Sequence, residues 1–377
     1  MKEIKGHRTA RRHTANNVGL HCHCGENKED LLKLLEKANQ EKVKYLIINN
    51  YKSLKVYTEI MEQLSEEEKR RYAHIKLLPS VELPACFTFT DLDGQKYNIE
   101  MHILAYGIDL SKEQELKDFV KSKYKSLNQE EELKRLIKIG KDIGLNFSDE
   151  DAKLDLEDDN RKFAGRAFMQ ALMKNMDDNF CKEGEISDYK LPYELRENWR
   201  AFNNRCVKDK NSPFFLDLAA LNPDIKDVIE FIHKLGGKVY LGHPSAYFAK
   251  TGSKEDIDKA HRNSIKLVED FMKLFSPLVS KIHIDGIEAF HPSYLGNYKV
   301  ISEIKEIARR EKVATSGGTD IHADKTMGDN ETVTSMSLSN SKRIKIRDLK
   351  KFRYIRRKSK SIEEIIKEVQ KSKSIER

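Results

Sequence analysis

Short apolar runs alternate along the first part of the chain with segments suited to helices. The runs 18–23, 43–48 and 75–82 are separated by residues 28–40, whose leucines recur at helical spacing, and by the charged helix-forming segment 57–71. Buried strands that alternate with helices at this spacing are typical of βαβ units. This pattern predicts a parallel sheet or barrel.

The pattern changes after residue 82. Two alternating runs, 85–90 and 97–106, flank Asp91-Leu-Asp-Gly94, a turn signal that predicts a β-hairpin. Residues 112–211 are rich in helix formers and charges, which predicts a helical insertion. Alternation then resumes, with predicted helices at 225–235, 253–275 and 298–311 and predicted strands at 238–242, 286–290 and 313–315.

These segments predict a discontinuous α/β domain with an insertion. The barrel-like part covers 17–111 and 212–332, and the helical insertion covers 112–211. Residues 1–16 form a basic arm without periodicity, and residues 333–377 form a basic tail. A chain of 377 residues is long enough for one large domain or two smaller ones.

Charge is concentrated near the C-terminus. The chain has a net charge of +8, whereas residues 341–360 alone carry eleven Lys and Arg and one Asp, a net +10. Such a segment on a near-neutral body is typical of contact with nucleic acid or another polyanion, with Phe352 and Tyr354 as stacking groups. A solvated tail in a lysine-rich protein explains the same composition, so both interpretations stay open.

Composition indicates the cellular compartment of the protein. No window approaches the roughly 20 consecutive apolar residues of a membrane helix, and the basic N-terminus is not followed by the apolar run of a secretory signal. The five cysteines are scattered apart from Cys22 and Cys24, which does not suggest a disulfide framework. The sequence therefore predicts a folded cytoplasmic protein with no membrane partner.

Histidines and carboxylates recur at the ends of the predicted strands. Because the carboxyl ends of parallel strands meet at one face, we expect these side chains to gather there. Imidazoles and carboxylates without a matching thiolate set suit Mn²⁺, Zn²⁺ or Fe²⁺. Two ions bridged by one carboxylate, for which Glu82 is the candidate, would clamp a phosphate and activate a water. The residues at strand ends are His21, His23, Glu82, His243, Asp320 and His322.

The order of these motifs resembles that of the PHP (polymerase and histidinol phosphatase) domain. The motifs are His21-Cys-His23, Pro79-Ser-Val-Glu82, His102-Ile-Leu-Ala-Tyr-Gly107, Gly237-Lys-Val-Tyr-Leu-Gly-His243-Pro244, Gly286-Ile-Glu-Ala-Phe290 and Gly318-Thr-Asp320-Ile-His322. The resemblance implies a distorted (β/α)7 TIM-like barrel with a multinuclear metal site at its carboxyl face. Phe163-Ala-Gly-Arg166 is similar to the Gly-Arg segment of the branch that dephosphorylates nucleoside 3',5'-bisphosphates and trims RNA from its 5' end.

The resemblance also implies roles for individual residues. The first ion would be held by His21, His23, Glu82 and Asp320, the second by Glu82, His102 and His243, and His322 would belong to a third. Arg166 would hold a substrate phosphate through its planar guanidinium. A metal-bound water or a nearby histidine, for which His322 is the candidate, would protonate the leaving oxygen. His291 lies at the same face and would support the ligands. No functional role is predicted for His233 or His283.

The chain departs from the family at the third metal position. Asn49-Asn50-Tyr51 stands where the family has Thr-Asp-His, and the loop after His23 is shortened to Cys24-Gly-Glu26-Asn27. We therefore expect two divalent ions, with Tyr51 filling the vacated space or contacting substrate, and Glu26 as the one possible substitute ligand.

Three functions fit these residues. The first is a metal-dependent phosphoesterase that hydrolyses a phosphorylated nucleotide or a nucleic-acid end through water activated by two metals. The second is a PHP-like domain that has lost catalysis and binds nucleic acid or protein. The third is metal-dependent C–N hydrolysis in an amidohydrolase-like barrel, which is least favoured because no lysine stands where a carbamylated bridge would need it.

Overall fold

The computed structural model divides into two compact units, residues 1–123 with 222–377 and residues 124–221, and each is described by itself. The residues that the structure describes are 17–125, 129–155, 164–181, 190–191, 195, 202, 206–207, 212–215, 217, 219–248, 254–290, 298–318, 321–322 and 353–375.

The first unit is built on one mixed sheet whose strands run in the order β8-β7-β6-β5-β4-β2-β1-β9, with β3 paired to β2. Most neighbours are parallel, but β5 is antiparallel to both β4 and β6. The predicted mixed α/β fold is confirmed. The strands are β1 (Asn17–His23), β2 (Val43–Tyr51), β3 (Lys76–Leu77), β4 (Ser80–Thr90), β5 (Lys96–Tyr106), β6 (Lys238–Leu241), β7 (Gly286–Phe290), β8 (Ala314–Gly317) and β9 (Ile321–His322).

Strands β4 and β5 form the predicted hairpin, in register from Ser80 opposite Tyr106 to Thr90 opposite Lys96. Its turn is fixed by Asp91, whose side chain accepts hydrogen bonds from the backbone N–H groups of Asp93 and Gln95. Gly94 has a φ of 79°, a conformation that favours glycine. The hairpin interrupts the parallel order and carries both Glu82 and His102.

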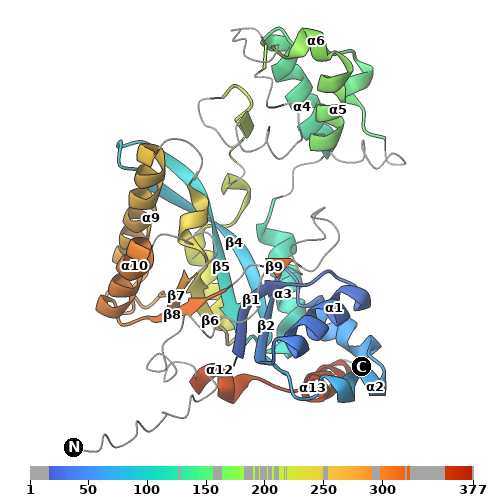
Figure 1. Ribbon diagram of the computed structural model, residues 1–377, viewed down its shortest axis with the longest axis vertical. Helices are drawn as coiled ribbons and strands as arrows, with labels where there is room; N and C mark the ends of the chain where they lie inside the picture. Colours follow the sequence, from blue (N-terminus) through green and yellow to red (C-terminus); the bar gives the residue numbers. More distant parts are fainter. Residues whose placement is uncertain are drawn as a thin grey trace, which may run out of the picture. The chain divides into compact units, whose positions relative to one another are not determined.

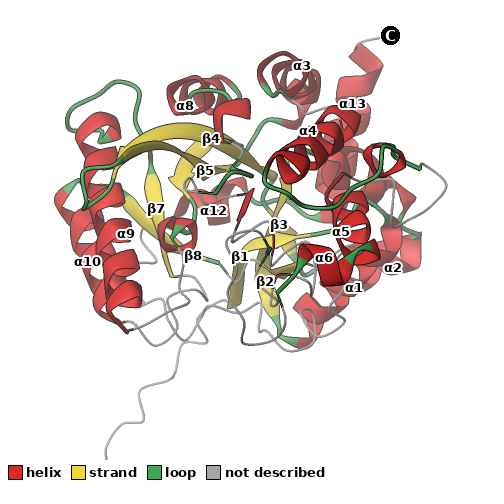
Figure 2. Cartoon of the chain, turned by 90° about the horizontal axis from the view of Figure 1, so that it is seen from above, coloured by secondary structure: helices red, strands yellow, loops and turns green. Residues whose placement is uncertain are grey.

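The sheet is curled (Figure 2). Strands β8 and β9 lie at opposite ends of the strand order, although residues 318–320 alone separate them along the chain. Gly317 and Ile321 are four residues apart in sequence, a span of at most about 14 Å, so the two ends of the sheet lie near each other. Gly318, directly after β8, lies against the side chain of His21 on β1.

Amphipathic helices cover the outside of this sheet (Figure 1). Helix α1 begins after Asn27, whose side chain accepts from the Asp30 N–H, and it buries Leu31, Leu34 and Leu35. The α-helices of this unit are α1 (Lys28–Gln40), α2 (Glu66–Arg71), α3 (Glu113–Lys123), α8 (Ile225–Lys234), α9 (Lys254–Phe275), α10 (Tyr298–Arg310), α12 (Arg353–Lys358) and α13 (Ile362–Ile375).

The prediction of a single helix over 57–71 is wrong. Short helical turns occupy Val56–Gln63, and α2 begins separately after Ser65. Ser65 and Glu68 form a capping box, in which each side chain accepts from the other's backbone N–H. This local arrangement satisfies the free N–H groups of a new helix start and so divides the segment.

The last part of the predicted basic tail is folded. Helix α13 buries Ile362, Ile365, Ile366 and Val369 within the first unit. Ile355 of α12 packs in a core cluster with Ile47 of β2 and Leu104 of β5. The Tyr354 ring lies against Gly107, and its hydroxyl donates to the Tyr106 carbonyl at 3.4 Å, so it is engaged within the chain. Phe352 lies outside the described residues. Arg356, Arg357 and Lys358 are exposed.

The second unit is helical, with α4 (Gln129–Asp142), α5 (Ala164–Lys174) and α6 (Met176–Asn179) around Phe147, Phe168, Phe202 and Phe214. Its boundaries, 124–221, differ from the predicted insertion 112–211. Helix α3 belongs to the first unit because the Phe119 ring stacks on Phe231 of α8, with centroids 3.8 Å apart. Within the described ranges, no helix has the length and apolar character needed to cross a membrane.

Candidate metal centre

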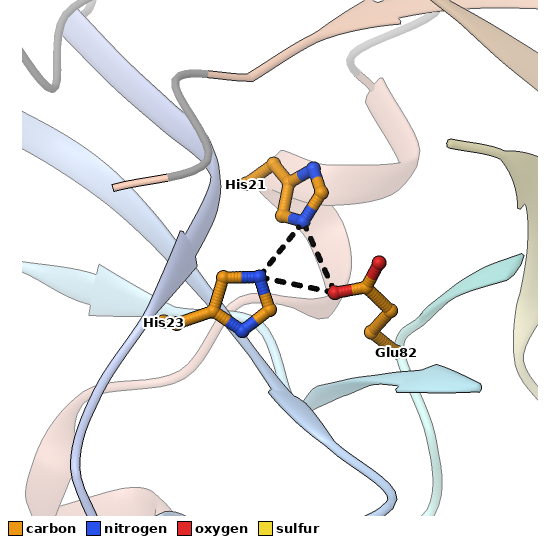
Figure 3. Close-up of side chains that lie close together, drawn as sticks. All are labelled: His21, His23 and Glu82. Atoms are coloured by element: carbon orange, nitrogen blue, oxygen red, sulfur yellow. Dashed lines mark hydrogen bonds and ion pairs between the residues drawn. The ribbon is translucent and has the colours of Figure 1, made fainter. Parts of the chain in front are cut away.

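Three side chains from two strands meet at one point of the first unit (Figure 3). His21 Nε2 lies 3.1 Å from His23 Nε2, and Glu82 Oε2 lies 3.4 Å from the first and 3.0 Å from the second. Ligands held about 2.0–2.2 Å from one ion lie roughly 3–3.5 Å apart, so this triangle has the size of one face of a coordination sphere. The His-x-His spacing on a strand turns both imidazoles to the same side, as predicted.

The second oxygen of Glu82 faces a different pair of histidines. Glu82 Oε1 lies 2.5 Å from His102 Nδ1 and 3.5 Å from His243 Nε2. One ligand atom each from Glu82, His102 and His243 lie within 4.8 Å of one another, as do those of His21, His23 and Glu82. A carboxylate that offers one oxygen to each of two imidazole pairs is the arrangement expected of a bridge between two ions.

A buried carboxylate behind the cluster orients two of these residues. Glu288 on β7 is fully buried, and its oxygens lie 3.2 and 3.3 Å from His21 Nδ1. Its Oε2 also accepts from the His243 backbone N–H at 2.9 Å. An imidazole that donates from Nδ1 to a carboxylate keeps the lone pair on Nε2, which is the nitrogen that faces His23 and Glu82.

Electrostatics in the cluster favour charged groups despite burial. Burial lowers the pKa of His102, but the charge of Glu82 and hydrogen bonds to Glu100 and Glu82 outweigh it and raise this pKa to about 10. Burial also lowers the pKa of His21, but the charges of Glu288 and Glu82 and hydrogen bonds to them outweigh burial and raise this pKa well above its usual value. Burial raises the pKa of Glu82, yet the His102 charge and hydrogen bonds from His102, His21 and His23 hold it well below its usual value. Without metal, the cluster therefore retains protons.

The side chain of Asn49 on β2 has buried polar atoms without partners in the described part of the chain. Asn49 is fully buried, and neither polar atom of its side chain has a hydrogen-bond partner in the described part of the chain. The neighbouring Asn50 is partly satisfied, because its Oδ1 accepts from the Cys24 N–H at 2.8 Å. A buried amide without partners is costly, and a bound water or ion ligand would supply what Asn49 lacks. The residues present thus fit a divalent metal centre.

The predicted ligands fall into three groups. His21, His23, Glu82, His102 and His243 are brought together as described above. His322 pairs with His23 in register through β9, which places its backbone beside the cluster. Asp320 lies outside the described residues, as does His291, which was predicted to support the ligands and not to bind metal.

The other predicted site residues are Tyr51, Glu26 and Arg166. The Tyr51 ring is 44% exposed and stands edge-on to His102, with centroids 5.9 Å apart. Glu26 is exposed, and its carboxylate lies 3.6 Å from Lys55 Nζ, outside the ligand groups. Arg166 is exposed on helix α5 of the second unit, so its contact with a substrate phosphate stays a prediction.

The sequence did not assign Glu288 or Tyr247 to the site. The Tyr247 hydroxyl accepts from the His102 N–H and donates to the Gly242 carbonyl, both at 2.8 Å, which ties β5 to the turn that carries His243. An acidic residue in the middle of the otherwise apolar strand Gly286–Phe290 is a signal that could have identified Glu288. Tyr247 has no comparable local signal.

Gly318 leaves room for the His21 side chain. A Cβ at this position would collide with His21 Cβ and with Glu288 Oε1. We expect Gly318→Ala to displace His21 and to weaken Zn²⁺ binding about tenfold or more, as for other losses of ligand orientation. Isothermal titration of the variant with Zn²⁺ measures this. Gly94→Ala is the control: its φ of 79° makes the substitution strained, but nothing lies within 4 Å of the added Cβ, so Zn²⁺ affinity should not change. Equal affinities for wild type and Gly318→Ala would contradict the expectation.

A comparison of the chain with models of known protein families gives no match, and a comparison with curated proteins gives none either. The assignment of chemistry therefore depends on the residues themselves. Two imidazole pairs joined by one carboxylate have the donor types and spacing for a pair of transition-metal ions.

Proposed function

We propose that this chain is a metal-dependent phosphoesterase with a PHP-like (β/α)7 barrel. His21, His23 and Glu82 would hold one divalent ion, and Glu82, His102 and His243 would hold the other, with Asp320 completing the first. The observation that carries the proposal is that the two oxygens of Glu82 face two different histidine pairs. The order of the sequence motifs supports the family.

Bound divalent ions supply a nucleophile from water at neutral pH and positive charge opposite phosphoryl oxygens. The protein residues would bind and orient the reactants. Glu288 fixes the ring of His21, and Tyr247 fixes the strand position of His102. Neither residue needs to contact substrate to act in this way.

Lys52 at the edge of the cluster suits a phosphorylated substrate. Its backbone N–H donates to the Glu82 carbonyl at 2.9 Å, and its φ of 59° is unusual for a residue other than glycine. Its Nζ lies 5.0 Å from the centroid of the Tyr51 ring, which itself abuts His102. A half-buried ammonium and an exposed aromatic ring offer charge for a phosphate and a surface for a base.

The test uses purified full-length protein, Mn²⁺, and a panel of a generic phosphodiester, a nucleoside 3',5'-bisphosphate and 5'-phosphorylated RNA. We expect turnover of at least one nucleotide substrate, lost on chelation and restored by Mn²⁺. Lys52→Ala should raise KM more than it lowers kcat if Lys52 binds the phosphate. Absence of turnover in protein with two confirmed ions per chain would reject the phosphoesterase.

Metal uptake should depend on pH. Because the pKa of His102 is raised to about 10, its imidazole is protonated in the metal-free chain at pH 7, and metal must displace that proton. Apparent affinity for Mn²⁺ should therefore rise with pH between 6 and 9, by roughly tenfold per pH unit for each proton displaced. Calorimetry in two buffers of different ionisation enthalpy counts the protons released; zero release would contradict the expectation.

A catalytically inactive binding module is the second candidate. It is favoured by Asn50 and Tyr51, which stand where the family has Asp and His. Exposed Arg356, Arg357 and Lys358 would then provide phosphate contacts. Because α13 is part of the core, the test is charge reversal of Arg356 and Arg357 instead of deletion. Loss of salt-sensitive RNA binding without any phosphoesterase activity in the wild type would favour this candidate.

A further inference from the structure

We propose a separate binding site for a divalent transition metal, best suited to Zn²⁺, formed by His233, His283 and Asp285. His233 lies in the last turn of α8, and the other two residues lie in the loop that leads into β7. One ligand atom from each of the three lies within 4.8 Å of the others. Two imidazoles and a carboxylate are a common zinc ligand set.

The geometry resembles that of the first cluster. His233 Nε2 lies 3.3 Å from Asp285 Oδ2, a separation that suits two ligands of one ion. The two imidazole rings lie 5.3 Å apart and are tilted by 49°, so they are not stacked face to face. All three residues are partly exposed, which gives an ion and a completing water access from solvent.

Neighbouring groups already orient two of the three ligands. His283 Nδ1 lies 2.9 Å from the Lys281 carbonyl, and a proton donated there leaves the Nε2 lone pair for metal. Asp285 Oδ2 accepts from the Val239 N–H at 2.9 Å. Metal-binding histidines and carboxylates are commonly held in this way by contacts behind them.

Lys238 limits the strength of the site and provides a test of it. Its Nζ lies 2.6 Å from Asp285 Oδ1, so its charge offsets that of the carboxylate and repels a cation. Removing this ammonium should strengthen metal binding. An ordinary ion-pair network of Lys238, Asp285 and His233 would instead gain no metal affinity from that change.

The site is independent of the Glu82 cluster. Lys238 is the first residue of β6, and His243 lies two residues beyond Leu241, the last one. The proposed zinc site and the Glu82 cluster therefore lie at opposite ends of that strand. Four strand residues cover about 13 Å, too far for one ion to contact both groups. Loss of this site should leave phosphoesterase activity unchanged.

The experiment measures zinc per chain in full-length protein that has been stripped with chelator and then dialysed against buffered micromolar Zn²⁺. We expect His283→Ala to bind one zinc fewer than wild type, with unchanged activity. We expect Lys238→Met to bind the same number, with that zinc held about tenfold more tightly. His74→Ala, at an exposed histidine outside both sites, should match wild type.

The readout is the difference between wild type and His283→Ala, so it does not depend on the first cluster. If the proposed phosphoesterase site binds no metal, wild type should hold one ion and His283→Ala none. His283→Gln keeps the size and polarity of the side chain and should lose the same ion if His283→Ala folds poorly. Equal zinc content in wild type and a folded His283 variant would overturn the proposal, as would zinc binding to Lys238→Met that is no tighter.

Discussion

Glu82→Gln is expected to lower kcat of the proposed phosphoesterase reaction by about a thousandfold or more and to remove one or both of the ions proposed for the Glu82 cluster. Both carboxylate oxygens face imidazole pairs, and the residue is nearly fully buried among them. A neutral amide of the same size keeps the packing but loses the charge that holds the cations. The measurements are kcat with Mn²⁺ and elemental analysis of the purified variant.

Glu67→Gln is the matched control, because Glu67 is an exposed carboxylate of α2 outside the cluster. It should retain both metal content and kcat. The ion assigned to His233, His283 and Asp285 is independent of Glu82, so the variant is analysed in a His283→Ala background to count only the cluster. Two ions retained with kcat unchanged would rule out a bridging role for Glu82.

Ile365→Ala is expected to lower the free energy of unfolding of the first unit by about 3 kcal/mol, within the range for large-to-small core substitutions. Ile365 is fully buried although only 12 residues follow it in the sequence. Its helix is tied down at both ends, because Leu77 and Lys360 exchange two backbone hydrogen bonds and Lys373 Nζ lies 2.8 Å from Glu62. Urea unfolding followed by circular dichroism measures the change.

Lys367→Ala on the exposed side of the same helix is the control, since it keeps helix propensity and removes no buried group. It should change the free energy of unfolding by less than about 0.5 kcal/mol. If Ile365→Ala is as stable as this control, then α13 does not contribute to the core, and the chain beyond residue 352 behaves as the tail that its charge suggested.

The clustering of these side chains could be predicted because the signals are local. His21 and His23 are one residue apart on a strand, and Glu82 and His243 each occur near the end of an apolar run. The orientation of the ligands could not be predicted in the same way. Glu288 meets His21 across 267 positions of sequence, and only the curl of the sheet makes that contact.

The C-terminal helices were missed for a different reason. Ile362, Ile365, Ile366 and Val369 have the spacing of a buried helix face, but the neighbouring run of Lys and Arg dominated the interpretation. A helix can carry charged residues on its exposed face while its opposite, apolar face is buried. The same applies to α3, whose charged residues suggested part of the insertion although Phe119 stacks on the first unit.

The hydrogen bond between His21 and Glu288 joins β1 and β7, which are each the second strand from an end of the sheet. It therefore connects strands near the two ends of the curled sheet. If these two strands separate, His21 loses the hydrogen bond that orients its ring. Warming should consequently release His21 by local opening between these strands, at temperatures where the helices outside the sheet still hold their structure.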